Sequence, residues 1–268
     1  VGHDEYWSGA QRANVEAARD ATPPVHIALF SGNEIYWKTR WEPSIDGSGT
    51  PYRTLVSYKE THANGKIDPA IDPATGAPIW TGTWRDPRFS PPGDGGRPEN
   101  ALTGTIFKVN SGTSGIGVPA DLGKHRFWRN TTIATMAPNT TVNLPGGTLG
   151  YEWDEAPNNG AQPPGLMRLS RRTVAGVETL LDFGNTYGAG TATHSLTLYR
   201  HESGALVFGA GTVQWSWGLD SNHDRGSAAA DARMRQATVN LFADMDVLPR
   251  TVQSGLVLSS PSNDASAP

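Results

Sequence analysis

A chain of 268 residues can bury a full hydrophobic core, and its 31 glycines and 20 prolines indicate many turns. It has no cysteine, which excludes disulfide bonds, cysteine-based zinc or iron–sulfur sites, and a cysteine nucleophile. The formal net charge is −4, and acidic and basic residues are interspersed along the chain. There is neither a basic stripe nor a long apolar run. We therefore expect neither nucleic acid nor a membrane as a partner.

The first forty residues predict a strand–helix–strand unit. Ser8 is a suitable N-cap for a helix over residues 9–21, and Pro23 ends that helix. The apolar run of residues 25–30 then predicts a buried parallel strand, followed by a turn at residues 31–33. Ligands bind at the carboxyl ends of parallel strands, so we expect a site where the strands of this βαβ unit end.

The middle of the chain is rich in loops. Residues 41–100 are dominated by Gly, Pro, Asp and Thr, and we expect a loop-rich insertion that either forms a rim or lid or is poorly ordered. Residues 101–110 are compatible with either a strand or a helix. Short strands are predicted over residues 125–129, 131–136, 141–144 and 148–153.

The last third of the chain predicts a hairpin, a helix and a tail. The hairpin joins residues 196–200 to residues 206–208. The helix is expected over residues 227–245, and residues 251–268 are expected to form a linker-like tail. Helical spacing is kept by Met234, Ala237, Leu241, Phe242 and Met245.

The first candidate site motif is Gly-His-Asp-Glu-Tyr-Trp at residues 2–7, which we expect at the end of a strand. In a functional interpretation it forms the floor of a pocket. In the structural alternative, Asp4 and Glu5 stabilise the following helix while His3 packs. The structural alternative is favoured for the two carboxylates, and function is favoured for His3 or Tyr6.

A second motif, Ser-Gly-Asn-Glu-Ile-Tyr-Trp at residues 31–37, follows the next strand. If the two strands are parallel neighbours, Tyr36 lies beside Tyr6. Either tyrosine alone could simply cap the core. Their pairing at two strand ends favours a site.

Two further motifs contain aromatic residues. Glu152 lies between Tyr151 and Trp153, and it is either a buried ligand or base or an exposed edge residue. Trp215 and Trp217 could line a site or bind a sugar ring, although packing under the last helix is the favoured interpretation.

Phosphate-loop, Gly-x-Ser-x-Gly and His-Glu-x-x-His motifs are absent from the sequence, and its seven histidines are scattered. A zinc site of the usual kind is therefore not expected. The ligands of a bound metal would be Tyr, Glu or Asp oxygens with at most one His. Such a set suits hard ions, and phenolate suits ferric iron.

The motifs Gly-His-Asp-Glu-Tyr-Trp, Ser-Gly-Asn-Glu-x-Tyr-Trp and Gly-Tyr-Glu-Trp-Asp occur in this order. Together they resemble the C-terminal domain of the N,N-dimethylformamidase large (beta) subunit, as found in secreted actinobacterial multidomain proteins. The resemblance implies an α/β fold of the glutamine-amidotransferase (flavodoxin-like) type over residues 1–250. Its parallel sheet would lack the N-terminal strands and carry additional antiparallel strands.

The resemblance also implies a chemistry. A mononuclear Fe(III) would be held by Tyr6, Tyr36 and Glu152, and metal-activated water would hydrolyse the C–N bond of a formamide or other small amide. His3 or Asp4 would move protons. Substrate contacts are expected from Asn33, Trp215 and Trp217. The amidase works with a small second subunit, for which the sequence offers no equivalent.

The alternative is a non-catalytic extracellular module whose tryptophans bind a glycan or a protein. In either case we expect a domain excised from a longer secreted chain, with the other domains of that chain as partners. Domains of the glutamine-amidotransferase type normally attack with a cysteine. Because this chain has none, amide cleavage here would depend on activated water.

Overall fold

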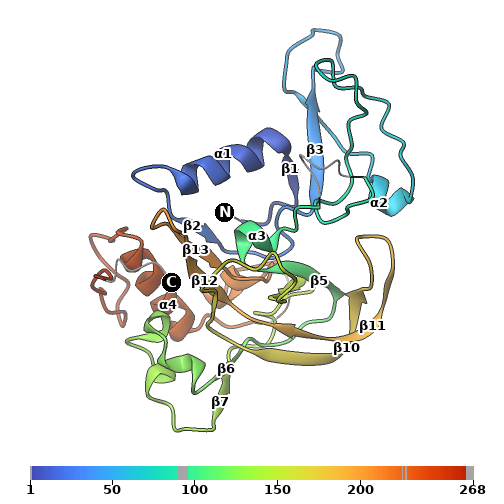
Figure 1. Cartoon of the computed structure of the whole chain (residues 1–268). Helices are drawn as coiled ribbons and strands as arrows, with labels where there is room; N and C mark the ends of the chain where they lie inside the picture. The colour runs from blue at the N-terminus through green and yellow to red at the C-terminus, as the bar shows by residue number, and fades with distance from the viewer. Residues whose placement is uncertain (1, 90–95, 225, 227, 264–268) are drawn as a thin grey trace.

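The computed structural model describes residues 2–89, 96–224, 226 and 228–263 (Figure 1). Their strands form four small sheets of three, four, four and two strands. Seven of the nine strand pairings are antiparallel, and the two parallel ones join β1 to β3 and β2 to β13. The expected flavodoxin-like parallel sheet is therefore wrong.

The reason lies in the connections between strands. A parallel sheet needs a crossover, usually a helix, between successive strands. Within the described residues only α1 (Gly9–Asp20) and α4 (Ala232–Asp244) are helices longer than four residues. Most other connections are loops and hairpins, which favour antiparallel pairing.

The N-terminal unit forms as expected in its local elements. β1 (Tyr6–Ser8) leads into α1, and the Ser8 hydroxyl caps the helix by accepting from the Gln11 amide at 3.1 Å. β1 pairs in parallel with β3 (Trp37–Glu42), and β4 (Thr54–Val56) completes this sheet. β2 (Ile27–Leu29) is buried and parallel as predicted, but its partner is β13, so β1 and β2 lie in different sheets.

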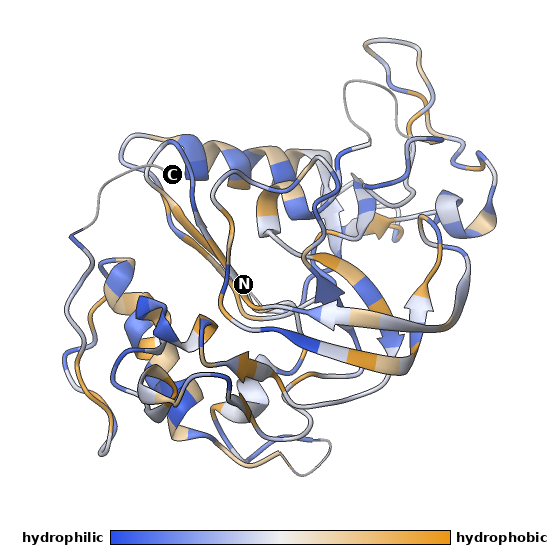
Figure 2. Ribbon diagram, turned by 60° about the horizontal axis from the view of Figure 1, so that its bottom comes forward, coloured by the Kyte–Doolittle hydropathy of each residue, from blue (hydrophilic) through white to orange (hydrophobic). Residues whose placement is uncertain are grey.

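Two four-stranded sheets make up most of the body. One has the order β11-β10-β5-β8, and the other has the order β2-β13-β12-β9 and lies beneath α1, with largely hydrophobic strands (Figure 2). The predicted hairpin is confirmed as β12 with β13. The bounds are β5 Ile106–Ser111, β8 Trp153–Glu155, β9 Met167–Arg168, β10 Arg172–Leu180, β11 Tyr187–His194, β12 Thr197–Arg200 and β13 Leu206–Gly209.

The segment of residues 41–100 is loop-rich, as predicted. Besides the end of β3 and β4, it contains α2 (Glu60–Ala63) and the start of α3 (Asn100–Thr103), and residues 90–95 lie outside the described residues. Figure 1 shows that it extends from one end of the molecule. The undecided stretch of residues 101–110 contains both alternatives, most of α3 and then β5.

The strands predicted over residues 125–136 are wrong. The chain there forms 3-10 turns η2 (Arg126–Trp128) and η3 (Thr132–Thr135), after η1 (Leu122–Lys124). The Thr131 hydroxyl accepts from the Ile133 amide at 3.2 Å, a local bond that competes with strand pairing. β6 (Gly117–Pro119), which precedes these turns, pairs with β7 (Thr141–Asn143), which follows them. The strand predicted over residues 148–153 forms only from Trp153 onwards, as β8.

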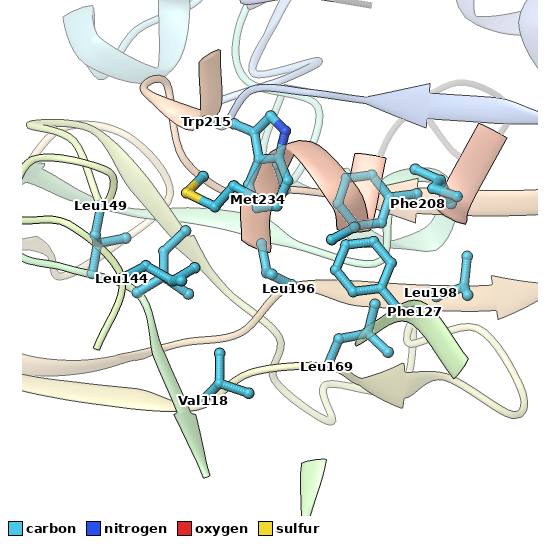
Figure 3. Close-up of a cluster of buried hydrophobic side chains, with 14 of the residues drawn as sticks. Val118, Phe127, Leu144, Leu149, Leu169, Leu196, Leu198, Phe208, Trp215 and Met234 are labelled. Atoms are coloured by element: carbon cyan, nitrogen blue, oxygen red, sulfur yellow. The ribbon is translucent and has the colours of Figure 1, made fainter. Parts of the chain in front are cut away.

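The largest hydrophobic cluster lies between the sheets and α4 (Figure 3). It contains Met234 and Leu241 from α4 and Trp215 from η4 (Trp215–Gly218). The last helix is thus confirmed, although it begins at Ala232 behind an Asp231 cap, and Ser227 lies outside the described residues. A separate small cluster contains Tyr36, Trp37, Phe107 and Leu180, with Tyr6 and Tyr187 packed against it.

The described part of the C-terminal tail packs against α4. The Gln236 side chain exchanges two hydrogen bonds with the backbone of Val257, and the Ser259 hydroxyl bonds to Asn240 at 2.5 Å. Residues 264–268 lie outside the described residues. Among the described helices, none has the length and apolar character needed to cross a bilayer.

His194 gives the fold a testable pH dependence. Its ring is fully buried and burial lowers its pKa to about 4, so the unfolded chain binds the proton between pH 6.5 and pH 4. Stability from this residue is therefore complete above pH 6.5 and declines as the pH falls. Between pH 7 and pH 5, the free energy of unfolding should therefore fall by about 2 kcal/mol less in His194→Gln than in the wild type.

Urea unfolding at the two pH values measures this difference. His62→Gln is the control, because His62 is exposed on α2. Identical pH dependence of the wild type and His194→Gln would contradict the assignment.

Candidate active site

The two tyrosines come together through the parallel pairing of β1 and β3. Tyr6 lies opposite Trp37 in the register, and Tyr36 directly precedes β3. Both rings pack in the same small hydrophobic cluster. The predicted neighbour of β1 was the strand that ends before residue 31, but that strand, β2, lies in another sheet. It is the pairing of β1 with β3 that brings Tyr36 into the same cluster as Tyr6.

The Tyr6 hydroxyl is paired with a cation. Lys59 donates from its Nζ to this oxygen at 2.8 Å. Partial burial raises the pKa of Tyr6, and the hydrogen bond from Lys59 opposes that rise. Glu5, beside Tyr6, has its pKa raised chiefly by burial, with the neighbouring Glu152 charge adding to the rise.

Tyr36 is almost completely buried, with 2% of its surface exposed. Its hydroxyl lies 3.5 Å from the hydroxyl of Tyr187 on β11, and the Arg85 guanidinium lies 5.1 Å from its ring centre. Burial raises the pKa of Tyr36 well above its usual value. Gly184 packs on the same hydroxyl, because a Cβ there would lie 2.8 Å from the Tyr36 oxygen.

Glu152 joins this site through Asn33. The Asn33 Nδ2 donates to Glu5 at 3.0 Å and to Glu152 at 3.1 Å. Asn33 has a φ of 52°, a left-handed conformation that asparagine tolerates better than most residues. The amide thus holds two carboxylates from distant parts of the chain at one point.

His3 lies beside Glu152 with a defined orientation. Its Nδ1 lies 3.0 Å from the Gly32 carbonyl oxygen, so Nδ1 carries the proton and donates it. Its Nε2 lies 3.9 Å from the nearer Glu152 oxygen. The His3 side chain is 40% exposed, so a neutral imidazole here presents its accepting nitrogen to both solvent and Glu152.

Two buried acids, Asp154 and Glu34, lie at the turn that contains Asn33. Asp154 accepts from the Asn33 amide at 2.9 Å and from the Thr105 hydroxyl at 2.8 Å, and burial raises its pKa to about 6. Burial, followed by repulsion from Asp154 and Asp4, raises the pKa of Glu34 to about 9. Glu34 is therefore neutral at pH 7, which reduces the repulsion among the acids of this region.

These features match a known family. The family model described as N,N-dimethylformamidase beta subunit-like, C-terminal, matches residues 1–227. The chain belongs to this family. Every residue placed in the site above lies within the matched range. No curated protein matches the chain.

Other predicted site residues of this dimethylformamidase-like chain make packing or helix contacts. Trp215 is fully buried in the large core, so its ring has no surface left for a substrate or glycan. Trp217 is half-buried and stacks on His223 with ring centres 4.6 Å apart. Trp215 thus follows the packing interpretation, whereas the substrate contact expected of Trp217 stays a prediction. The Asp4 carboxylate accepts from Gln11 on the first turn of α1 at 3.2 Å, which matches its structural alternative.

The site also contains residues that sequence reasoning did not select. Lys59 comes from the loop-rich segment, and Tyr187 and Arg85 come from stretches without a recognisable motif. No sequence signal links them to Tyr6 or Tyr36, because these contacts depend on how the segment of residues 41–100 and the β10–β11 turn pack. Glu5 belongs to the first motif, where the sequence favoured a role in stabilising the start of the helix. In the structure it accepts from Asn33 instead.

The oxygen atoms of this site limit the kind of metal ion that it could hold. The described residues hold no group of three or more His, Asp or Glu side chains able to bind a metal. A metal here would therefore need the phenol oxygens. Tyr6, Tyr36 and Glu152 offer two phenols and a carboxylate around the Asn33 turn, and hard oxygen donors of this kind fit ferric iron.

Asn33 provides a test of the site's architecture. In Asn33→Asp a third carboxylate would face Glu5 and Glu152 in place of the bridging amide. We expect the free energy of unfolding to fall by about 1–3 kcal/mol at pH 7 and by less at pH 5, where protonation relieves the repulsion. Urea unfolding at both pH values measures the effect.

Asn33→Gly is the matched control, because glycine keeps the left-handed backbone and adds no charge. Its loss should depend less on pH than that of Asn33→Asp. Equal pH dependence of the two variants would show that Asn33 does not bridge the carboxylates.

Proposed function

We propose that the protein is a metal-dependent hydrolase of amide C–N bonds, with a formamide or another small amide as its substrate. The observations that support the proposal are that Tyr6 and Tyr36 share one small cluster and that Glu152 accepts from Asn33, three residues before Tyr36, in a chain of the dimethylformamidase-like family. These three residues would hold a mononuclear ferric ion. When bound, such an ion supplies a Lewis acid that polarises a carbonyl and acidifies water.

His3 is suited to move the proton. With Nδ1 donating to Gly32, the neutral ring can accept a proton only at Nε2, on the side of Glu152. As the water oxygen bonds to the carbonyl carbon, Nε2 takes the proton from the water. When the C–N bond breaks, the same nitrogen returns the proton to the leaving amine.

Asn33 and Glu5 complete the polar floor of the site. The Asn33 amide fixes the Glu152 carboxylate while its own position is set by Asp154. This preorganisation limits the reorganisation needed when charge develops in the transition state. Asn33 was also expected to contact substrate, but its Nδ2 donates to the carboxylates of Glu5 and Glu152, which favours a supporting role.

Iron binding and hydrolysis test the proposal directly. We expect the protein loaded with Fe(III) to absorb in the visible through phenolate-to-iron charge transfer and to release amine from N,N-dimethylformamide. Tyr6→Phe, Tyr36→Phe and Glu152→Gln should each weaken iron binding by more than the ~10–100-fold typical of an outer-shell contact, and abolish amine release. Elemental analysis, absorption spectra and amine assays measure these effects.

Tyr52→Phe is the control. This substitution also removes a phenol hydroxyl group, but Tyr52 is 75% exposed in the loop-rich segment. A colourless wild-type protein that retains no iron would refute the metal proposal. A coloured protein inactive on a panel of formamides and small amides would refute the proposed substrate class.

A further inference from the structure

We propose that Lys59 is a positioning residue for Tyr6, and that the segment of residues 41–100 delivers this lysine to the site. The inference deepens the proposed function and rests on it for the role of Tyr6 as a metal ligand. The contact between Lys59 and Tyr6 itself is independent of that role.

The position of the ammonium group is the first observation. Lys59 Nζ lies 2.8 Å from the Tyr6 oxygen, 5.1 Å from the centre of the Tyr6 ring and 4.9 Å from the centre of the Trp37 ring. The side chain is half-buried. The ammonium thus lies over two aromatic rings of adjacent parallel strands, and its hydrogen bond is directed at the proposed ligand atom.

The backbone of Lys59 is the second observation. Lys59 has φ and ψ of 49° and 47°, a left-handed conformation that is unfavourable for a lysine. Neighbouring structure must therefore hold it there. The chain turns at this residue directly into α2, and this turn directs the Lys59 side chain back towards β1.

The buried carboxylate of the next residue holds this turn in place. Glu60 is fully buried and accepts from the backbone amides of Ile67, Asp68 and Thr81 at 2.8–2.9 Å, and from Lys66 Nζ at 2.8 Å. These bonds connect the start of α2 to two later parts of the loop-rich segment. Removing such a paired buried charge is strongly destabilising, so the position of Lys59 is built into the segment.

A second contact connects this segment to the other tyrosine. The Thr83 hydroxyl donates to the Phe183 carbonyl at 2.8 Å, in the turn between β10 and β11 that also contains Gly184. The segment therefore reaches the Tyr6 side through Lys59 and the Tyr36 side through this turn. Through Lys59 and Thr83, the described part of the segment is connected to the surroundings of both tyrosines.

The chemical effect of Lys59 follows from its charge. A hydrogen bond from an ammonium stabilises a phenolate oxygen and restricts its direction. Partners of this kind around metal ligands typically alter metal affinity by ~10–100-fold. Because Lys59 withdraws electron density from the Tyr6 oxygen, it also raises the energy needed to move an electron from that oxygen to ferric iron.

The experiment compares Lys59→Met and Lys59→Arg with the wild-type chain loaded with Fe(III). We expect Lys59→Met to shift the visible absorption band to longer wavelength and to weaken Fe(III) binding by ~10–100-fold. Lys59→Arg keeps a cationic donor and should lie closer to the wild type in both measurements. A band unchanged in Lys59→Met would overturn the proposal.

Lys124→Met is the matched control for the loss of one positive charge, because Lys124 Nζ bonds to the Ala134 carbonyl at 2.8 Å, in the η1–η3 region. It should leave the band unchanged. An equal shift in this control would assign the effect to net charge and overturn the role of Lys59.

A metal-free measurement separates this proposal from the proposed function. In protein labelled with 3-fluorotyrosine, the Tyr6 ¹⁹F NMR signal is identified by its absence in Tyr6→Phe. We expect Lys59→Met to move this signal in the iron-free protein, and Lys59→Arg to move it less. A moved signal in a protein that binds no iron would support the Lys59–Tyr6 contact and refute the metal proposal, whereas an unmoved signal would overturn the contact.

Discussion

The turn at Asn33 is the constraint on which the rest of the site depends. Its backbone amide is fixed by the buried Asp154, and its side chain holds Glu5 and Glu152 together. Gly32 makes this possible, because a Cβ there would lie 2.8 Å from the Thr212 amide nitrogen. The turn thus packs directly on the chain that follows β13, and it joins four distant parts of the sequence at one point.

The acids around this turn are tolerated because they are not all charged. Burial keeps Glu34 neutral at pH 7 and brings the pKa of Asp154 to about 6. Arg85, paired with Glu99 at 2.9 Å, supplies a buried positive charge that opposes the rise in the pKa of Asp154. The pKa values of Glu34 and Asp154 are thus set chiefly by burial, and neighbouring charges and hydrogen bonds modify them.

Local elements could be predicted from the sequence, but their assembly could not. The Ser8 cap and the apolar spacing in α4 depend on residues within one element, and both were recognisable. The partner of β2 and the contact of Lys59 with Tyr6 join residues far apart in the chain. The flavodoxin-like sheet was expected by family resemblance, and the motifs behind that resemblance describe the site turns rather than the sheets.

The separation of the site cluster from the large core has an evolutionary consequence. Tyr6, Tyr36 and Tyr187 pack in a small cluster of their own, while Trp215 and α4 belong to the main core. Under the proposed function, substitutions around the tyrosines would change recognition and reactivity while the packing of the main core stays the same. A lineage carrying this domain could explore new substrates by exchanging the loops around the cluster, with the main core serving as a constant scaffold.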